Sequence, residues 1–92
     1  MTESRDALEA ALTRLQQERD KLQVKLHLAS MDAKDEYDRL SGRVDELKKQ
    51  YEPVSDAVGE TATNVFSALG LAAEELQHGF GRVWKSIKDS AQ

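Results

Sequence analysis

Residues 4–51 read SRDALEAALTRLQQERDKLQVKLHLASMDAKDEYDRLSGRVDELKKQY, with a single glycine and no proline. The apolar residues of this stretch recur every three or four positions once Arg19 is counted with them, which is the spacing of one face of an α-helix. We therefore expect one long amphipathic helix over residues 4–51. Its apolar row consists of Leu8, Leu12, Leu15, Leu22, Leu26, Ala29, Ala33, Tyr37, Leu40, Val44, Leu47 and Tyr51.

A second helix is predicted over residues 55–89, after a turn at residues 51–55. Pro53 has no N–H group and its ring clashes with the preceding turn, so it disfavours continuation of the first helix. The second helix contains several glycines, which weaken a helix on its own. We therefore expect it to be held by packing against the first helix. Its apolar row is Val54, Val58, Ala62, Val65, Leu69, Ala72 or Ala73, Leu76, Phe80, Val83 and Ile87.

The predicted fold class is all-α. Residues 1–92 would form one helical-hairpin domain, with two antiparallel helices and a short tail at residues 90–92. One alternative stays open, because the apolar spacing runs on in phase through Leu47, Tyr51, Val54 and Val58. This continuity would also fit one long kinked helix in a coiled-coil dimer.

The composition narrows the possible functions. A chain of 92 residues buries a limited core, and oligomerisation often supplies the remaining stability. The formal charge is −4 and no block of basic residues occurs, which argues against binding to nucleic-acid phosphates. Cysteine is absent, which excludes disulfides and thiolate metal sites. The charged start and the lack of a long apolar run predict a cytoplasmic protein.

The two helices of the hairpin differ in length, which predicts an interface with another chain. Leu8 and Leu12 would extend past the end of the shorter helix and find no partner in the same chain. Both helices also carry apolar or glycine residues opposite the main row. We therefore predict self-association as a homodimer or higher oligomer, in a four-helix bundle or coiled coil. Docking of another protein on the first helix is a second predicted interaction. The predicted interface residues are Leu8, Leu12, Leu15, Val24, Leu28, Met31, Phe66, Gly70 and Trp84.

One pair of residues has the spacing of an iron ligand set. Glu75 and His78 form a Glu-x-x-His pair, which binds iron in four-helix bundles when further glutamates such as Glu36 or Glu46 complete the site. Helical geometry argues against this, because His78 would point nearly opposite the core row. A di-iron bundle is kept as an alternative function. No catalytic, cofactor-binding or metal-binding residue is predicted.

The C-terminal segment 80–88 suggests another alternative. Phe80, Val83, Trp84 and Ile87 share one side of the predicted helix, and basic residues share the other. An interfacial membrane helix has this pattern, so a reversible lipid-surface binder is possible. Packing of the last turns on another helix explains the same pattern and is favoured.

A family resemblance rests on two groups of residues. The first is Asp32-Ala33-Lys34-Asp35-Glu36-Tyr37 with Leu40 and Leu47, and the second is Leu76, Gly79, Val83-Trp84 and Ile87. The chain resembles small bacterial coiled-coil proteins of unknown function, which have a central Asp-Ala-Lys-x-x-Tyr segment and a C-terminal Trp-x-x-aliphatic group. The resemblance covers residues 22–88 and departs from the pattern between Gly59 and Gly70. It implies an all-helical protein without known catalysis that is loosely associated with stress. From the unpaired leucine row and the second apolar face we predict a non-catalytic interaction or scaffold protein, or a stress-related assembly protein, that acts through helix–helix association.

Overall fold

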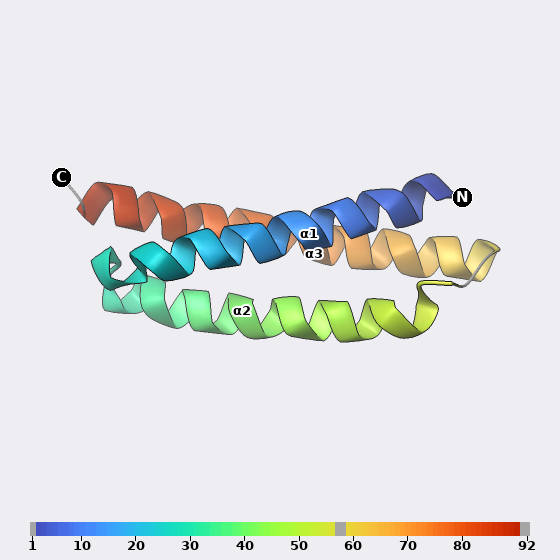
Figure 1. The fold of residues 1–92 in the computed structure, drawn as a ribbon, viewed down its shortest axis with the longest axis horizontal. Helices are drawn as coiled ribbons and strands as arrows, with labels where there is room; N and C mark the ends of the chain where they lie inside the picture. The colour runs from blue at the N-terminus through green and yellow to red at the C-terminus, as the bar shows by residue number, and fades with distance from the viewer. Residues whose placement is uncertain (1, 57–58, 91–92) are drawn as a thin grey trace.

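The computed structural model describes residues 2–56 and 59–90. These residues form three long helices, α1 (Thr2–Lys25), α2 (Met31–Tyr51) and α3 (Glu60–Ser90). The short 3-10 turns η1 (Leu26–Leu28) and η2 (Glu52–Val54) follow α1 and α2, and no strand occurs in the described part of the chain. The helices run up, down and up along a bundle of 49 × 18 × 17 Å (Figure 1). The predicted all-α fold class is confirmed.

The chain reverses direction at residues 26–30, so the prediction of one helix over residues 4–51 is wrong. Ala29 and Ser30 have extended backbone angles, and the Ser30 hydroxyl accepts a hydrogen bond of 3.2 Å from the Ala33 amide. Ser30 is thus the N-cap of α2, with Asp32 favourably placed in the first turn. The reversal folds the apolar row into two antiparallel halves, and α3 packs against both of them. The burial of this row outweighs the few helical hydrogen bonds lost at the break.

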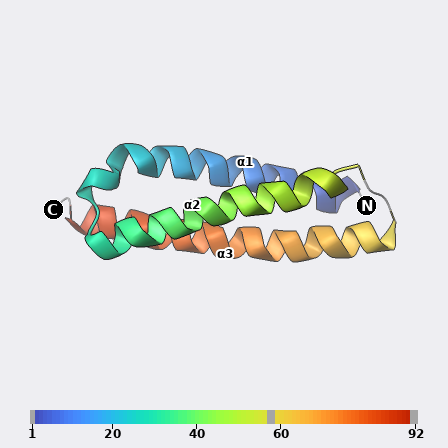
Figure 2. The same cartoon turned by 90° about the horizontal axis from the view of Figure 1, so that it is seen from below.

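The second connection is longer than the predicted turn at residues 51–55. Pro53 lies within η2, and α3 begins at Glu60. Gly59 precedes α3 with a φ of 101°, which a residue with a side chain rarely adopts. The alternative of one long kinked helix is wrong, because α3 returns alongside α1 and α2 (Figure 2). Val58 and residues 91–92 of the expected tail lie outside the described residues.

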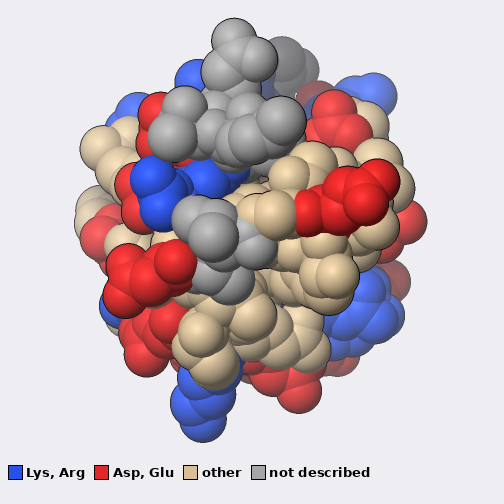
Figure 3. All heavy atoms as spheres, turned by 90° about the vertical axis from the view of Figure 1, so that its right-hand side faces the viewer, with Lys and Arg blue, Asp and Glu red and all other residues tan. Residues whose placement is uncertain are grey.

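Figure 3 looks onto the end of the bundle that holds this connection, where acidic and basic side chains are interspersed among uncharged ones.

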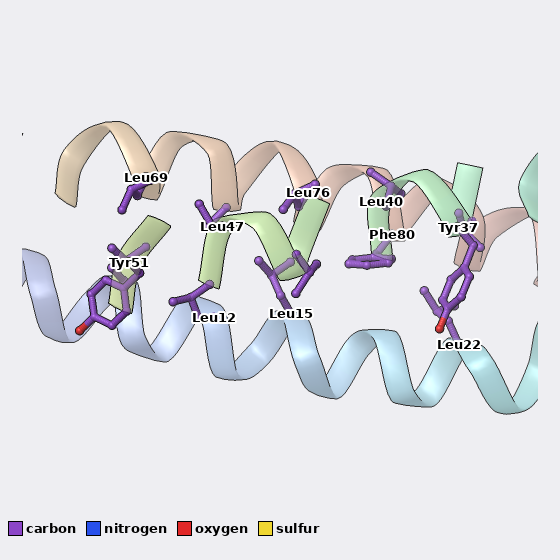
Figure 4. Packing of buried hydrophobic residues seen from close by; sticks show 14 of the residues in the cluster. Leu12, Leu15, Leu22, Tyr37, Leu40, Leu47, Tyr51, Leu69, Leu76 and Phe80 are labelled. Atoms are coloured by element: carbon purple, nitrogen blue, oxygen red, sulfur yellow. The ribbon is translucent and has the colours of Figure 1, made fainter. Parts of the chain in front are cut away.

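The core lies along the axis of the bundle, where all three helices contribute apolar side chains. Phe80, Leu15 and Leu22 are almost fully buried (Figure 4). Nearly every member of the two predicted apolar rows is buried or packs at the edge of this core. The buried residues are Leu8, Leu12, Leu15, Leu22, Ala33, Tyr37, Leu40, Val44, Leu47, Tyr51, Ala62, Phe66, Leu69, Ala73, Leu76, Phe80, Val83 and Ile87.

α2 and α3 are in close contact at Gly79. A Cβ atom added at Gly79 would lie 2.7 Å from Leu40 Cδ2, so the absence of a side chain at Gly79 is what admits Leu40. One turn away, the ring centroids of Tyr37 and Phe80 are 6.1 Å apart. On the surface above them, Arg82 Nη2 lies 3.0 Å from Glu36 Oε1.

The seam between α1 and α2 is bridged by polar groups at two levels. The Tyr51 hydroxyl donates a hydrogen bond of 2.6 Å to Glu9 Oε1, and burial together with this carboxylate raises the pKa of Tyr51 to about 12. Further along, Arg19 Nη1 lies 2.8 Å from Asp45 Oδ1, and this hydrogen bond holds the pKa of Asp45 below its usual value. The Tyr37 hydroxyl donates to the Arg19 carbonyl at 3.0 Å. These bonds fix how α1 lies against α2.

Candidate interaction surfaces

Four of the predicted interface residues lie in the core of this chain. Leu8, Leu12 and Leu15 are at most 6% exposed, and Phe66 is 4% exposed. The expected row of uncovered leucines is therefore wrong. It depended on a long first helix that outran the second one, whereas α3 lies beside α1 and covers this row (Figure 1).

The structure gathers four other predicted interface residues at one end of the bundle. Val24 and Met31 are 74% and 72% exposed, and Leu28 and Trp84 are exposed to a lesser degree. Val24, Leu28 and Met31 flank the α1–α2 reversal, while Trp84 comes from α3. We call the surface formed by these four residues the turn end.

Two contacts hold α3 against the α1–α2 reversal. Lys25 Nζ lies 5.2 Å from the centroid of the Trp84 ring, a cation–π geometry. The hydroxyl oxygens of Ser30 and Ser86 are 3.4 Å apart. These contacts place Trp84 beside the end of α1.

An apolar hollow lies between α1 and α3, near the opposite end. Its volume is about 480 Å³. Small residues keep its floor low, and a Cβ atom added at Gly70 would meet no atom within 4 Å. Leu71, on the wall of the hollow, is 67% exposed. We call this surface the α1–α3 hollow; its lining residues are Ala7, Leu8, Ala11, Phe66, Ser67, Gly70, Leu71 and Glu74.

Sequence reasoning found Leu8, Phe66 and Gly70 in this hollow but missed Leu71. Leu71 lies off the apolar row of α3, and a single off-row leucine is common on protein surfaces. The available signal was its position directly after Gly70. Because glycine has no side chain, an exposed leucine there lies next to free space on the helix surface. Ala7 and Ala11, one helical turn apart on α1, were also missed.

The predicted iron ligands lie on a surface rich in arginine. Glu75 and His78 line a hollow of about 230 Å³ between α2 and α3, together with Arg39, Arg43 and Arg82. Arginine side chains disfavour a metal cation by charge repulsion. Glu36 forms its ion pair with Arg82. Among the residues that the structure describes, no group of three or more histidine or acidic side chains is placed to hold a metal.

The apolar face of segment 80–88 is part of the core. Phe80, Val83 and Ile87 are at most 2% exposed, and Trp84 is the member of this segment's apolar set that reaches the surface. In the folded bundle this face is therefore not available to a lipid surface. None of the described helices has the length and apolar character needed to cross a membrane.

Comparison of the chain with protein-family models, curated proteins and solved structures gave no match. The resemblance to small bacterial coiled-coil proteins therefore stays a prediction. Any proposed function rests on the surfaces described above.

Proposed function

We propose that this chain is a non-catalytic interaction protein that associates with a second copy of itself through the α1–α3 hollow. One observation carries the proposal: an exposed leucine, Leu71, lies directly beside an open apolar hollow on the same face. In a twofold symmetric dimer the same patch serves both subunits, so a protruding side chain and the space to receive it must lie together. The α1–α3 hollow has both.

The dimensions of the bundle favour contact along its side. A side of 49 by 18 Å offers roughly 900 Å² per chain, which reaches the roughly 800 Å² per partner of a stable interface. An end of 18 by 17 Å offers only roughly 300 Å², which falls short of that. The α1–α3 hollow lies on a side of the bundle, where a second copy can lie against it.

The apolar contribution to such a dimer is appreciable. Fully burying a leucine side chain contributes about 1.5–3 kcal/mol. In a twofold symmetric dimer this contact occurs twice, once for each subunit. The lining residues Leu8 and Phe66 supply an apolar floor. Because each chain has three helices, the dimer would be a six-helix assembly; the four-helix bundle expected from two hairpins does not fit this fold. As a scaffold or stress-related assembly protein, the chain would act through such helix–helix contacts.

Sedimentation equilibrium at micromolar concentration tests the proposal with a matched pair of variants. Leu71→Glu places a charge at the hollow, and Met31→Glu does the same at the turn end, where the side chain is equally exposed. We expect the wild type and Met31→Glu to sediment as dimers and Leu71→Glu as a monomer. Circular dichroism should show all three folded, because both positions are exposed.

A monomeric wild type would contradict self-association. A dimeric Leu71→Glu variant would contradict the use of the α1–α3 hollow.

A further inference from the structure

The two connections of the bundle differ in the residues that bend the chain. The connection between α2 and α3 contains Pro53, which disfavours helix continuation, and Gly59, whose φ of 101° a residue with a side chain rarely adopts. The α1–α2 reversal at residues 26–30 reads Leu-His-Leu-Ala-Ser and contains neither residue type. All five of its residues can adopt helical angles at little cost, because none is glycine or proline.

The apolar pattern also continues through the reversal. Leu22, Leu26, Ala29 and Ala33 follow one another in steps of three and four, so they would share one face of an uninterrupted helix. No residue between Leu22 and Ala33 is buried in the bundle. Straightening residues 26–30 would therefore disturb little packing within the reversal, and it would restore the helical hydrogen bonds that the break interrupts.

Ser30 supplies the contacts that favour the bent form. Its hydroxyl accepts the hydrogen bond of 3.2 Å from the Ala33 amide, which stabilises the start of α2 where the chain enters from an extended segment. The same hydroxyl lies 3.4 Å from that of Ser86 on α3. In an uninterrupted helix the Ala33 amide would bond to the Ala29 carbonyl instead. Loss of the Ser30 hydroxyl therefore favours the straight form.

The polar contacts of α1 with α2 and the residues after it are centred on the reversal. In each pair the position midway between the two residues in the sequence falls within residues 28–32. The pairs are Arg5–Ser55, Glu9–Tyr51, Arg19–Tyr37, Arg19–Ser41 and Arg19–Asp45. Two straight helices from two copies, laid antiparallel about this midpoint, would repeat these contacts between the copies. Ala29 and Ser30 would lie at the centre, where their short side chains let the two helices approach closely.

From these observations we infer that two copies of the chain exchange α1. In the exchanged dimer residues 26–30 are helical, so α1 and α2 form one continuous helix, whereas the single chain folds back as described above. The α1 helix of each copy fills the surface of α2 and α3 that the other copy's α1 has left. The core contacts of α1 are retained, because only the copy that supplies α1 changes. This exchange does not rest on association through the α1–α3 hollow.

Chemical crosslinking shows which copy supplies α1. Arg19→Cys and Asp45→Cys place two thiols where side chains touch between α1 and α2, and the chain has no other cysteine. A short bifunctional thiol reagent joins these positions within one chain in the single bundle, but between two chains in the exchanged dimer. We expect a covalent dimer on a denaturing gel after refolding at millimolar concentration, and mainly a crosslinked monomer after refolding at low micromolar concentration. Association through the hollow leaves this crosslink within one chain, so failure of that proposal would not alter the result.

Substitutions at two neighbouring positions shift the exchange in opposite directions. Ser30→Ala removes the cap and should raise the dimerisation constant at least about 25-fold, from about fivefold for each of the two reversals. Met31→Pro fits the single bundle, because Met31 is the first residue of α2 and Ser30 before it is extended. Inside a continuous helix the proline should lower the constant at least about a thousandfold. Met31→Ala removes the same side chain without adding a ring, so this control should exchange like the wild type.

Circular dichroism at micromolar concentration should show the folded helical bundle for every variant. The absence of covalent dimers from Ser30→Ala after refolding at millimolar concentration would overturn the inference. Covalent dimers that persist undiminished in Met31→Pro would also overturn it, because the crosslink would then form without a continuous helix.

Discussion

Gly79 and Gly70 of α3 mark the difference between the α2–α3 seam and the α1–α3 seam. At Gly79 the side chain of Leu40 fills the place where a Cβ atom would lie, and the two helices are in close contact. At Gly70 the corresponding space is open and forms part of a hollow of about 480 Å³. The same residue type thus allows close contact between α2 and α3 at Gly79 and leaves space between α1 and α3 at Gly70. The hollow of about 230 Å³ between α2 and α3 is lined mostly by charged side chains, whereas the hollow at Gly70 is lined mostly by small and apolar ones, and we propose that the latter receives another chain.

Alanine substitutions at these two glycines test the comparison with the largest expected effect. Both changes favour the helix by about 1 kcal/mol, so this gain cancels when the two variants are compared. Gly79→Ala additionally forces Leu40 to move within a packed core, which costs about 1–3 kcal/mol. We expect Gly70→Ala to stabilise the bundle and Gly79→Ala to be less stable than it by that amount.

Urea unfolding in the Leu71→Glu background measures this difference without a contribution from association. Equal stabilities of the two variants would show that Gly79 and Leu40 are not in the close contact described.

A smaller effect is expected from the hydrogen bond that fixes α1 to α2 beside Tyr51. Because the pKa of Tyr51 rises from 10.0 to about 12 on folding, the folded state favours the protonated phenol. The resulting stabilisation is complete below pH 10 and is lost as the pH rises through about 12. Tyr51→Phe should cost about 1 kcal/mol at neutral pH, as expected for one hydrogen bond.

The pH dependence tests the raised pKa of Tyr51, to which burial contributes most and the Glu9 carboxylate second. The variant should lose less stability than the wild type between pH 10 and 12 in urea unfolding at each pH. Identical pH profiles would mean that folding does not raise the pKa of Tyr51.

The sequence was sufficient to predict helices and core, because burial follows the three-and-four spacing of Leu8 through Tyr51 almost residue by residue. It did not predict the reversal at residues 26–30. Leu26 and Ala29 continue the apolar row in phase, so periodicity cannot distinguish one long helix from two antiparallel helices that share a row. The distinguishing signal was Ser30 followed by Asp32, a helix start within an otherwise continuous pattern.

The candidate surfaces were predicted only in part for the same reason. Val24, Leu28 and Met31 were chosen because they lie opposite the apolar row, a local property that survives the reversal. Leu8 and Leu12 were predicted as interface residues because the first helix was expected to be longer than the second. The reversal divides that helix in two, so the expected overhang does not exist. Leu71 indicates an interface only because it lies beside the hollow at Gly70. This hollow is formed by the packing of α1 on α3, which the sequence pattern does not predict.

Spin labels attached to single cysteines test self-association through the α1–α3 hollow most directly, because the chain has no cysteine of its own. Asn64 lies seven residues before Leu71 and therefore on the same side of α3, while Asp38 is exposed on α2. Pulsed dipolar spectroscopy of Asn64→Cys and Asp38→Cys compares the two faces. We expect an intermolecular coupling that is stronger, and a distance that is shorter, at position 64 than at position 38. No intermolecular coupling at either position, or a shorter distance at position 38, would contradict it.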